Sequence, residues 1–229
     1  MMKYLAVGWA LVLFLIMPAV SSASDKEDDV SRTQNAARVF QEIMNAPDSI
    51  PHDVLNKARC IAIIPGDKKF AFIFGGDYGR GLAVCRTATG WSAPLYLAVE
   101  GGSVGYQIGG SSTDLILLFM NDHALHSLLS DKFKLGGDAS VAAGPVGRDA
   151  TASTDLKLTA EILSYSRTKG IFAGVNLDGT VVTADKSGDK AMYGADATRH
   201  DILDGSVPVP HHAHLLVQEL QRYSATAGD

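Results

Sequence analysis

The sequence lacks the patterns that would name an enzyme or a cofactor site. The glycines between residues 101 and 110 are followed neither by a helical pattern nor by Gly-Lys-Ser/Thr, and a phosphate loop needs a helix N-terminus or a lysine there. Ser103 lacks the flanking glycine pattern of a nucleophile elbow. Taken by themselves, these residues name no reaction, and we expect no cofactor.

Metal ligands in a recognisable spacing are also lacking. The histidines are concentrated at His211, His212 and His214, with His123 and His126 on another predicted helix. Imidazoles at this density can bind zinc or copper. However, no cysteine or acidic residue stands beside them at helical spacing. We interpret them as surface residues and predict no metal site.

No single sign of charge dominates the chain. It has 20 Lys and Arg against 25 Asp and Glu, for a net charge of −5, so nucleic acid is not an expected partner. No linker rich in Pro, Gly and Ser divides the sequence. Its length suits one compact domain better than two.

The apolar run near the N-terminus is short. Lys3 precedes apolar residues from Tyr4 to Met17, then Pro18 and a small-residue stretch that ends at Ala23. This order is typical of a secretory signal peptide, residues 1–23, which leaves residues 24–229 as a single exported domain. The alternative is a retained membrane anchor, which the shortness of the run and Pro18 disfavour.

Only two cysteines occur, Cys60 and Cys85, and both lie near predicted strands. An exported protein can form a disulfide between them. The alternative is two buried thiols that pack as small apolar side chains. Neither cysteine has the neighbouring histidine that would suggest a catalytic thiolate.

What the sequence does contain is a long stretch of strand-like segments punctuated by glycine, from Lys68 to Met120. Apolar side chains alternate through much of it, as at Phe70, Phe72 and Phe74, and alternation places them on one face of an extended chain. Residues 115–120 are apolar on both faces, which indicates a central strand. The pattern predicts an α+β fold, with an antiparallel glycine-rich sheet curled into a barrel or sandwich and flanked by N- and C-terminal helices.

Other segments complete this prediction. Asp178-Gly179 is the strongest hairpin signal, between apolar segments 171–177 and 180–184. Helices are predicted over residues 30–44 and 53–58, over 122–129 with Asn121 or Asp122 as the cap, over 196–203 with Gly205 as the stop, and up to Tyr223. Further strands are predicted over residues 60–64, 139–146 and 156–162, and a hairpin turn at Thr89-Gly90; Leu156, Ala160 and Leu163 would also fit a helix.

Four motifs, in this order, resemble the SYLF domain family. They read FIFGGDYGRGLAVCR, GWSAPLYLAVEGGSVGYQIGG, KLGGDASVAAGPVGRDA and EILSYSRTKGIFAG. The resemblance covers about Thr33 to Tyr193. It implies lipid binding without enzymatic activity, and phosphoinositide or actin binding in eukaryotic members.

With the signal peptide, the resemblance predicts a bacterial protein that is periplasmic or secreted, or peripheral on the envelope membrane. The expected partner is bulk phospholipid, bound by apolar insertion and a few cationic contacts. The alternative is a structural or protein-interaction module of the envelope that binds a protein partner and no lipid.

Two lipid contacts are predicted. One is the first helix, where an apolar stripe and two arginines could lie on a membrane or the stripe could pack on the sheet. The other is a pair of lysines before an apolar strand, which could instead be a solvated strand end. The first contact comprises Arg32, Arg38, Phe40, Ile43 and Met44, and the second comprises Lys68, Lys69 and Phe70.

Overall fold

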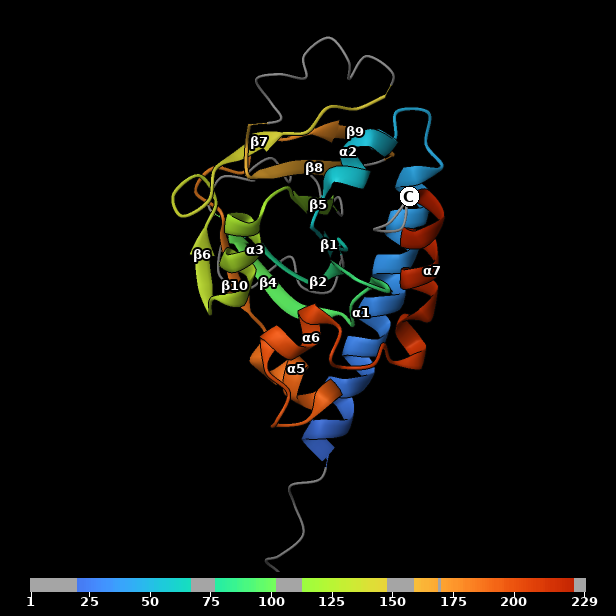
Figure 1. The fold of residues 1–229 in the computed structure, drawn as a ribbon, viewed down its shortest axis with the longest axis vertical. Helices are drawn as coiled ribbons and strands as arrows, with labels where there is room; N and C mark the ends of the chain where they lie inside the picture. The colour runs from blue at the N-terminus through green and yellow to red at the C-terminus, as the bar shows by residue number, and fades with distance from the viewer. Residues whose placement is uncertain (1–19, 67–76, 102–112, 148–158, 169, 225–229) are drawn as a thin grey trace, which may run out of the picture.

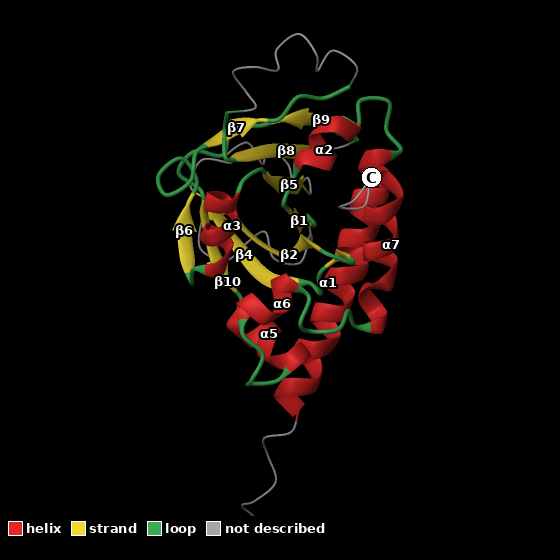
Figure 2. Ribbon diagram, in the orientation of Figure 1, coloured by secondary structure: helices red, strands yellow, loops and turns green. Residues whose placement is uncertain are grey.

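The computed structural model describes residues 20–66, 77–101, 113–147, 159–168 and 170–224. Within them the fold is α+β, with one curled, mostly antiparallel sheet and helices from both ends of the chain packed against it (Figures 1 and 2). The predicted fold class is therefore confirmed.

The sheet runs in the order β6-β10-β4-β2-β1-β5-β8-β7, with β3 paired to β2 and β9 paired to β8. The strands are β1 (Cys60–Ile64), β2 (Asp77–Thr87), β3 (Gly90–Trp91), β4 (Leu95–Gly101), β5 (Thr113–Phe119), β6 (Lys132–Lys134), β7 (Val141–Ala143), β8 (Ile162–Thr168), β9 (Ile171–Gly174) and β10 (Val181–Ala184). The β7–β8 pairing is parallel. β1 lies between β2 and β5, which explains why its five residues are all buried.

Side chains alternate between two apolar clusters on opposite faces of the sheet. Along β1, Ile61 and Ile63 join one cluster, while Ala62 and Ile64 join the other. The helices are α1 (Val20–Met44), α2 (His52–Lys57), α3 (Asp122–Leu129), α5 (Lys186–Tyr193), α6 (Arg199–Asp204), the short 3-10 helix η2 (His211–Ala213) and α7 (His214–Tyr223). Residues of α1 and α7 complete the first cluster, and residues of α3 and α6 complete the second.

Local signals place several of these boundaries. The Asn121 side chain accepts a hydrogen bond from the Ala124 N–H at 2.8 Å, which caps α3 as the sequence predicts. Gly205 ends α6 with φ 90°, in the left-handed region that glycine adopts without strain. The predicted turn near Gly90 joins β2 to β3.

The hairpin predicted at Asp178-Gly179 is wrong. The turn exists, with φ 88° at Gly179, but β9 pairs with β8, whereas β10 pairs with β4 and β6. Phe172 of β9 and Val182 of β10 belong to the two different apolar clusters. Burial on opposite faces therefore separates the two strands that the local turn signal joins.

Other boundaries also differ from the prediction. The strand expected over 156–162 begins only at Ile162, and residues 156–158 lie outside the described residues, as do Phe70, Phe72 and Phe74. α5 was not predicted, although Asp185 caps its start by accepting from the Gly188 N–H and Gly194 follows its end with positive φ.

Candidate functional site

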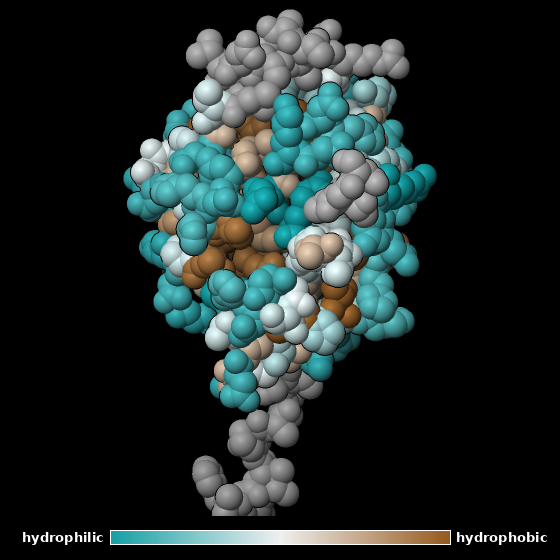
Figure 3. Space-filling view, in the orientation of Figure 1, coloured by the Kyte–Doolittle hydropathy of each residue, from teal (hydrophilic) through white to brown (hydrophobic). Residues whose placement is uncertain are grey.

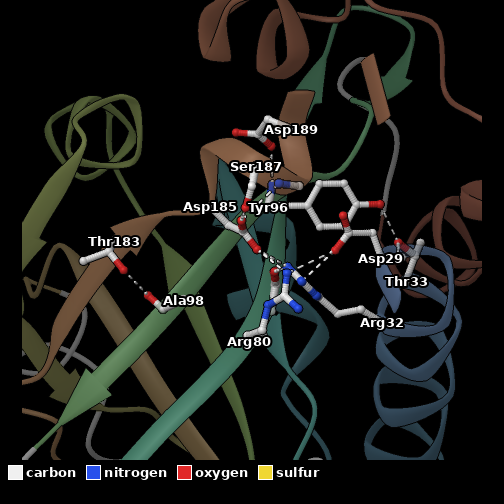
Figure 4. Close-up of polar contacts among 12 residues, drawn as sticks. Asp29, Arg32, Thr33, Arg80, Tyr96, Ala98, Thr183, Asp185, Ser187 and Asp189 are labelled. Carbon is white, nitrogen blue, oxygen red and sulfur yellow. Dashed lines mark hydrogen bonds and ion pairs between the residues drawn. The ribbon is translucent and has the colours of Figure 1, made fainter. Parts of the chain in front are cut away.

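A buried charge cluster joins α1 to the sheet and to α5 (Figure 4). Arg32 of α1 lies between two carboxylates: its Nη2 is 2.6 Å from Asp29 Oδ1, and its Nη1 donates to Asp185 Oδ2 at 2.9 Å. Arg80 of β2 also donates to Asp185 Oδ2, at 2.8 Å. Asp29 is fully buried and Arg32 is 5% exposed. We call Asp29, Arg32, Arg80 and Asp185 the α1 charge cluster.

A second pair lies next to this cluster. Arg199 of α6 contacts Asp189 of α5 at 3.0 Å and donates to the Leu128 carbonyl oxygen at 2.8 Å. Asp189 also accepts the Tyr96 N–H of β4 at 2.7 Å. These contacts fix α5 and α6 to each other, to β4 and to the end of α3.

The Tyr96 side chain connects the cluster to the apolar core. The Thr33 hydroxyl donates to the Asp29 carbonyl oxygen at 2.9 Å, so the Tyr96 hydroxyl donates to Thr33 Oγ1, also at 2.9 Å. The Arg32 guanidinium lies 5.1 Å from the centre of the Tyr96 ring. Burial raises the pKa of the Tyr96 phenol, so it remains a neutral hydrogen-bond donor.

The two buried carboxylates have opposite pKa shifts. Burial opposes ionisation of Asp185, but hydrogen bonds from Arg80, Ser187 and the Gly188 N–H hold the pKa of its carboxyl well below its usual range. Burial raises the pKa of Asp189 to about 6, although the Tyr96 N–H and Arg199 oppose this rise. Asp189 therefore titrates nearer to neutral pH than Asp185.

The charges in this region balance. Three aspartates (Asp29, Asp185 and Asp189) face three arginines (Arg32, Arg80 and Arg199). A region with no excess charge has no general attraction for an anionic or cationic ligand. The ion pairs and hydrogen bonds of this region connect α1, α5 and α6 to β2 and β4. These charges therefore stabilise the fold.

The first predicted lipid contact does not lie on the surface. Phe40 and Ile43 are fully buried and Met44 is 6% exposed, all in the apolar cluster under α1. Arg32 is held in the charge cluster, so only Arg38 is exposed, where it donates to the Asn35 side chain. The stripe packs on the sheet because that burial removes it from water more completely than a membrane surface would.

The second predicted contact, Lys68, Lys69 and Phe70, lies outside the described residues. The chain leaves β1 through Gly66 and returns at Asp77 of β2. At the same end of the sheet, Ile171 of β9 is 74% exposed. The sequence does not show that Ile171 is exposed, because an apolar residue after Gly170 can equally be buried.

The structure joins Cys60 and Cys85 by a disulfide. They are directly opposite each other in the β1–β2 pairing. The sequence left this pairing open, because only the register between the two strands brings the two side chains together.

The histidines are partly brought together. The rings of His211 and His214 lie 5.3 Å apart, on consecutive turns at the start of α7. Elsewhere, His200, Asp201 and Asp204 place ligand atoms within 4.8 Å of one another on α6. The Asp201 carboxylate accepts the Thr198 N–H in the capping box of α6, and Asp204 accepts the Ser206 N–H, so both carboxylates already have structural partners.

Comparison with known proteins identifies the family. A family model described as "Ysc84: Las17-binding protein actin regulator" matches residues 100–223. The chain belongs to the Ysc84 family. Its resemblance to SYLF proteins is thereby confirmed.

Three relatives illustrate the similarity. The chain is 34% identical over 201 residues to Protein YSC84 of Saccharomyces cerevisiae, which covers 83% of this chain and 43% of the relative. It is 36% identical over 184 residues to the SH3 domain-containing protein PJ696.02 of Schizosaccharomyces pombe, which covers 79% of this chain and 43% of the relative. It is 32% identical over 206 residues to the human SH3 domain-containing YSC84-like protein 1, which covers 88% of this chain and 60% of the relative. The chain thus spans about half the length of these relatives.

These findings correct the predicted location. A bacterial periplasmic or secreted protein was expected, but the matching relatives are yeast and mammalian proteins and the family model describes an actin regulator. The signal peptide, residues 1–23, stays a prediction. α1 begins at Val20, and residues 1–19 lie outside the described residues. Within the described part of the chain, no helix has both the length and the apolar content of a membrane span.

Proposed function

We propose that this chain is a non-enzymatic lipid-binding domain that contacts a phospholipid surface through one end of its sheet. The observation that carries the proposal is the exposure of Ile171, the most exposed large apolar side chain among the described residues. An isolated exposed isoleucine is ordinary. Its position at this end of the sheet is what favours a lipid contact.

Several strand ends meet where Ile171 lies. The register pairs Thr168 with Ile171 and also with Thr113, and it pairs Asp77 with Gly101. The connections of residues 67–76 and 102–112 therefore start and finish at this end. The first of them contains Lys68, Lys69 and Phe70 in its sequence. Apolar side chains next to lysines suit the boundary between lipid headgroups and acyl chains.

The absence of enzymatic activity is part of the proposal. The buried charges of α1, α5 and α6 pair with partners in the fold, and the pairs Arg32–Asp185, Arg80–Asp185 and Arg199–Asp189 each connect two elements. A reaction centre instead needs ionisable groups that converge on a space for substrate.

Sedimentation with vesicles tests the proposal. Vesicles of phosphatidylcholine, with and without phosphatidylserine, should carry the protein down, and Ile171→Asp should weaken this binding because a carboxylate replaces the inserted side chain. Lys68→Ala and Lys69→Ala should each weaken binding to phosphatidylserine vesicles by roughly five-fold. Gln34→Asp, which adds the same charge to the exposed face of α1, is the matched control. Absence of binding to vesicles of either composition would defeat the proposal.

A second candidate function is protein binding, which the family description favours. Figure 3 shows apolar side chains gathered in a hollow between α3 and α6. The partly buried Leu125, Leu129 and Val207 pack on the apolar cluster beneath these helices. A partner on this surface would be captured by the wild-type chain and by Ile171→Asp, but not by Leu125→Glu. Capture that is lost only with Ile171→Asp would contradict this assignment.

A further inference from the structure

The disulfide between Cys60 and Cys85 lies under a short helix. Both cysteines are buried, 0% and 3% exposed, in the apolar cluster that also contains Ile202 and Leu203 of α6. Of the two helices that complete this cluster, α6 packs on β2 and β4, whereas α3 packs on β6 (Figure 1). α6 therefore covers β2, the strand that carries Cys85.

The residue that ends α6 lies close to the disulfide. Thr87 follows Cys85 by two residues in β2, so both side chains point to the same face of the sheet. A Cβ atom placed on Gly205 would lie 3.0 Å from Thr87 Cγ2, so the end of α6 approaches β2 closely there. Together with the buried side chains of α6, this approach screens the two sulfur atoms from water.

α6 should be easier to displace than the strands beneath it. It has only six residues, and a helix of this length is held by tertiary contacts more than by its own hydrogen bonds. Its contacts include the buried Ile202 and Leu203 and the ion pair of Arg199 with Asp189. β1, in contrast, is paired on both sides, with β2 and β5. Local opening of α6 should therefore cost less free energy than unfolding of the sheet.

We propose that α6 and the disulfide form a redox switch, in which a thiol reductant reaches the bond only while α6 is displaced. A thiolate of a dithiol attacks one sulfur, forms a mixed disulfide with it and releases the other cysteine as a thiolate. The second thiol of the reductant then displaces the first cysteine. The dithiol thus gives two electrons and two protons to Cys60 and Cys85, which become thiols, and leaves as a cyclic disulfide. The switch does not depend on a lipid ligand.

The rate of reduction of the folded protein tests the inference. The oxidised full chain is incubated with dithiothreitol at about pH 8, where the reductant is partly thiolate. Alkylation followed by mass spectrometry then counts the thiols that form. Thr198→Ala removes the capping box of α6 and should speed reduction about five-fold. Ile202→Ala removes buried contacts of α6 and should speed reduction at least about thirty-fold.

Two control variants separate opening of α6 from general destabilisation. Leu216→Ala truncates a buried leucine of α7 in the other apolar cluster, and Asn121→Ala removes the cap of α3. Both should leave the rate of reduction nearly unchanged, because these residues hold α7 and α3 in place. Circular dichroism and urea unfolding check that each variant is folded and measure how far it is destabilised.

The outcomes decide between local and global opening. If Leu216→Ala speeds reduction as much as Ile202→Ala at an equal loss of stability, reduction requires global unfolding and the inference is overturned. A rate that Thr198→Ala leaves unchanged, or that Asn121→Ala raises equally, also overturns it. So do two free thiols in the purified wild type.

Discussion

At the scale of single residues, Arg32 shows how surroundings decide what a charge does. Its sequence position on an amphipathic helix suggests a headgroup contact, but the folded chain places it between Asp29 and Asp185. Asp29 and Asp185 are compensated by two guanidiniums, those of Arg32 and Arg80, so loss of Arg32 leaves buried negative charge with less compensation. The same side chain therefore has a structural role that its helical spacing does not reveal.

Replacing Arg32 by alanine should destabilise the fold strongly. The variant leaves Asp29 and Asp185 with less cationic compensation, so the free energy of unfolding should fall by about 3–5 kcal/mol. Urea unfolding followed by circular dichroism measures this loss. Arg38→Ala removes an exposed arginine from the same helix and should change stability by less than about 0.5 kcal/mol. Equal effects of the two substitutions would contradict the structural role of the cluster.

Asp189 should make stability depend on pH. Its folded pKa, about 6, is above the ordinary carboxyl value, so the folded state binds more protons than the unfolded state between those values. The contribution of Asp189 to the free energy of unfolding should thus be greatest below about pH 4 and should fall as the pH rises to about 6. Asp185 acts in the opposite sense: because its pKa is lowered, its contribution is complete above about pH 4 and is lost progressively as the pH falls below that value.

Asp189→Asn isolates this effect. The amide cannot ionise, so the fall in stability between about pH 4 and 6 should be smaller by on the order of 3 kcal/mol than in the wild type. Urea unfolding across this pH range gives the two profiles. Asp53→Asn, at an exposed carboxylate of α2, should leave the profile nearly unchanged. Parallel profiles for the wild type and Asp189→Asn would refute this assignment.

At the scale of elements, the pairing of β1 with β2 depends on more than backbone hydrogen bonds. The disulfide of Cys60 and Cys85 closes a loop of 25 residues between the two strands. In the chain-entropy model, such a loop restricts the unfolded state and stabilises the fold. Long-range strand order in this sheet is thus reinforced at its central pair.

Loss of the disulfide should weaken the fold measurably. The variant Cys60→Ala/Cys85→Ala should lose about 3 kcal/mol of unfolding free energy, as measured by thermal and urea unfolding. A reductant should lower the melting temperature of the wild type but not of the double variant, which serves as the control. If the reductant has no effect on the wild type, the disulfide does not contribute to stability in solution.

At the scale of the whole molecule, α1 is part of the core. Phe40 and Ile43 share one apolar cluster with side chains of β1, β2, β5 and β8. The N-terminal helix therefore cannot leave the sheet without exposing that cluster to water. Any lipid contact of the folded molecule must use another surface, such as the end of the sheet at Ile171.

Phe40→Asp should consequently unfold the chain, so that any loss of ligand binding would be a result of unfolding. Loss of the buried ring alone costs about 3–5 kcal/mol, and a buried carboxylate adds to this. Circular dichroism and thermal unfolding should show a large loss of structure, whereas Gln34→Asp on the exposed face of α1 should remain folded. A folded Phe40→Asp variant that fails to bind vesicles would instead indicate that Phe40 is part of the lipid contact.

Helices and most strands follow from the sequence, because apolar periodicity and capping residues act over a few neighbouring positions. The pattern of α1, the cap at Asn121 and the stop at Gly205 are examples. The failure at Asp178-Gly179 has the same origin, since a local turn signal cannot report that β9 and β10 are paired with different distant strands.

The sequence by itself determined the family, the α+β class and the helical nature of the chain ends. Only the tertiary structure decided that Arg32 is buried, that Cys60 faces Cys85, and that Ile171 and Leu215 are exposed. The physical reason is that burial and charge pairing depend on residues far apart in the chain, such as Arg32 and Asp185. Such residues come into contact only when the strands pair and the helices pack on them.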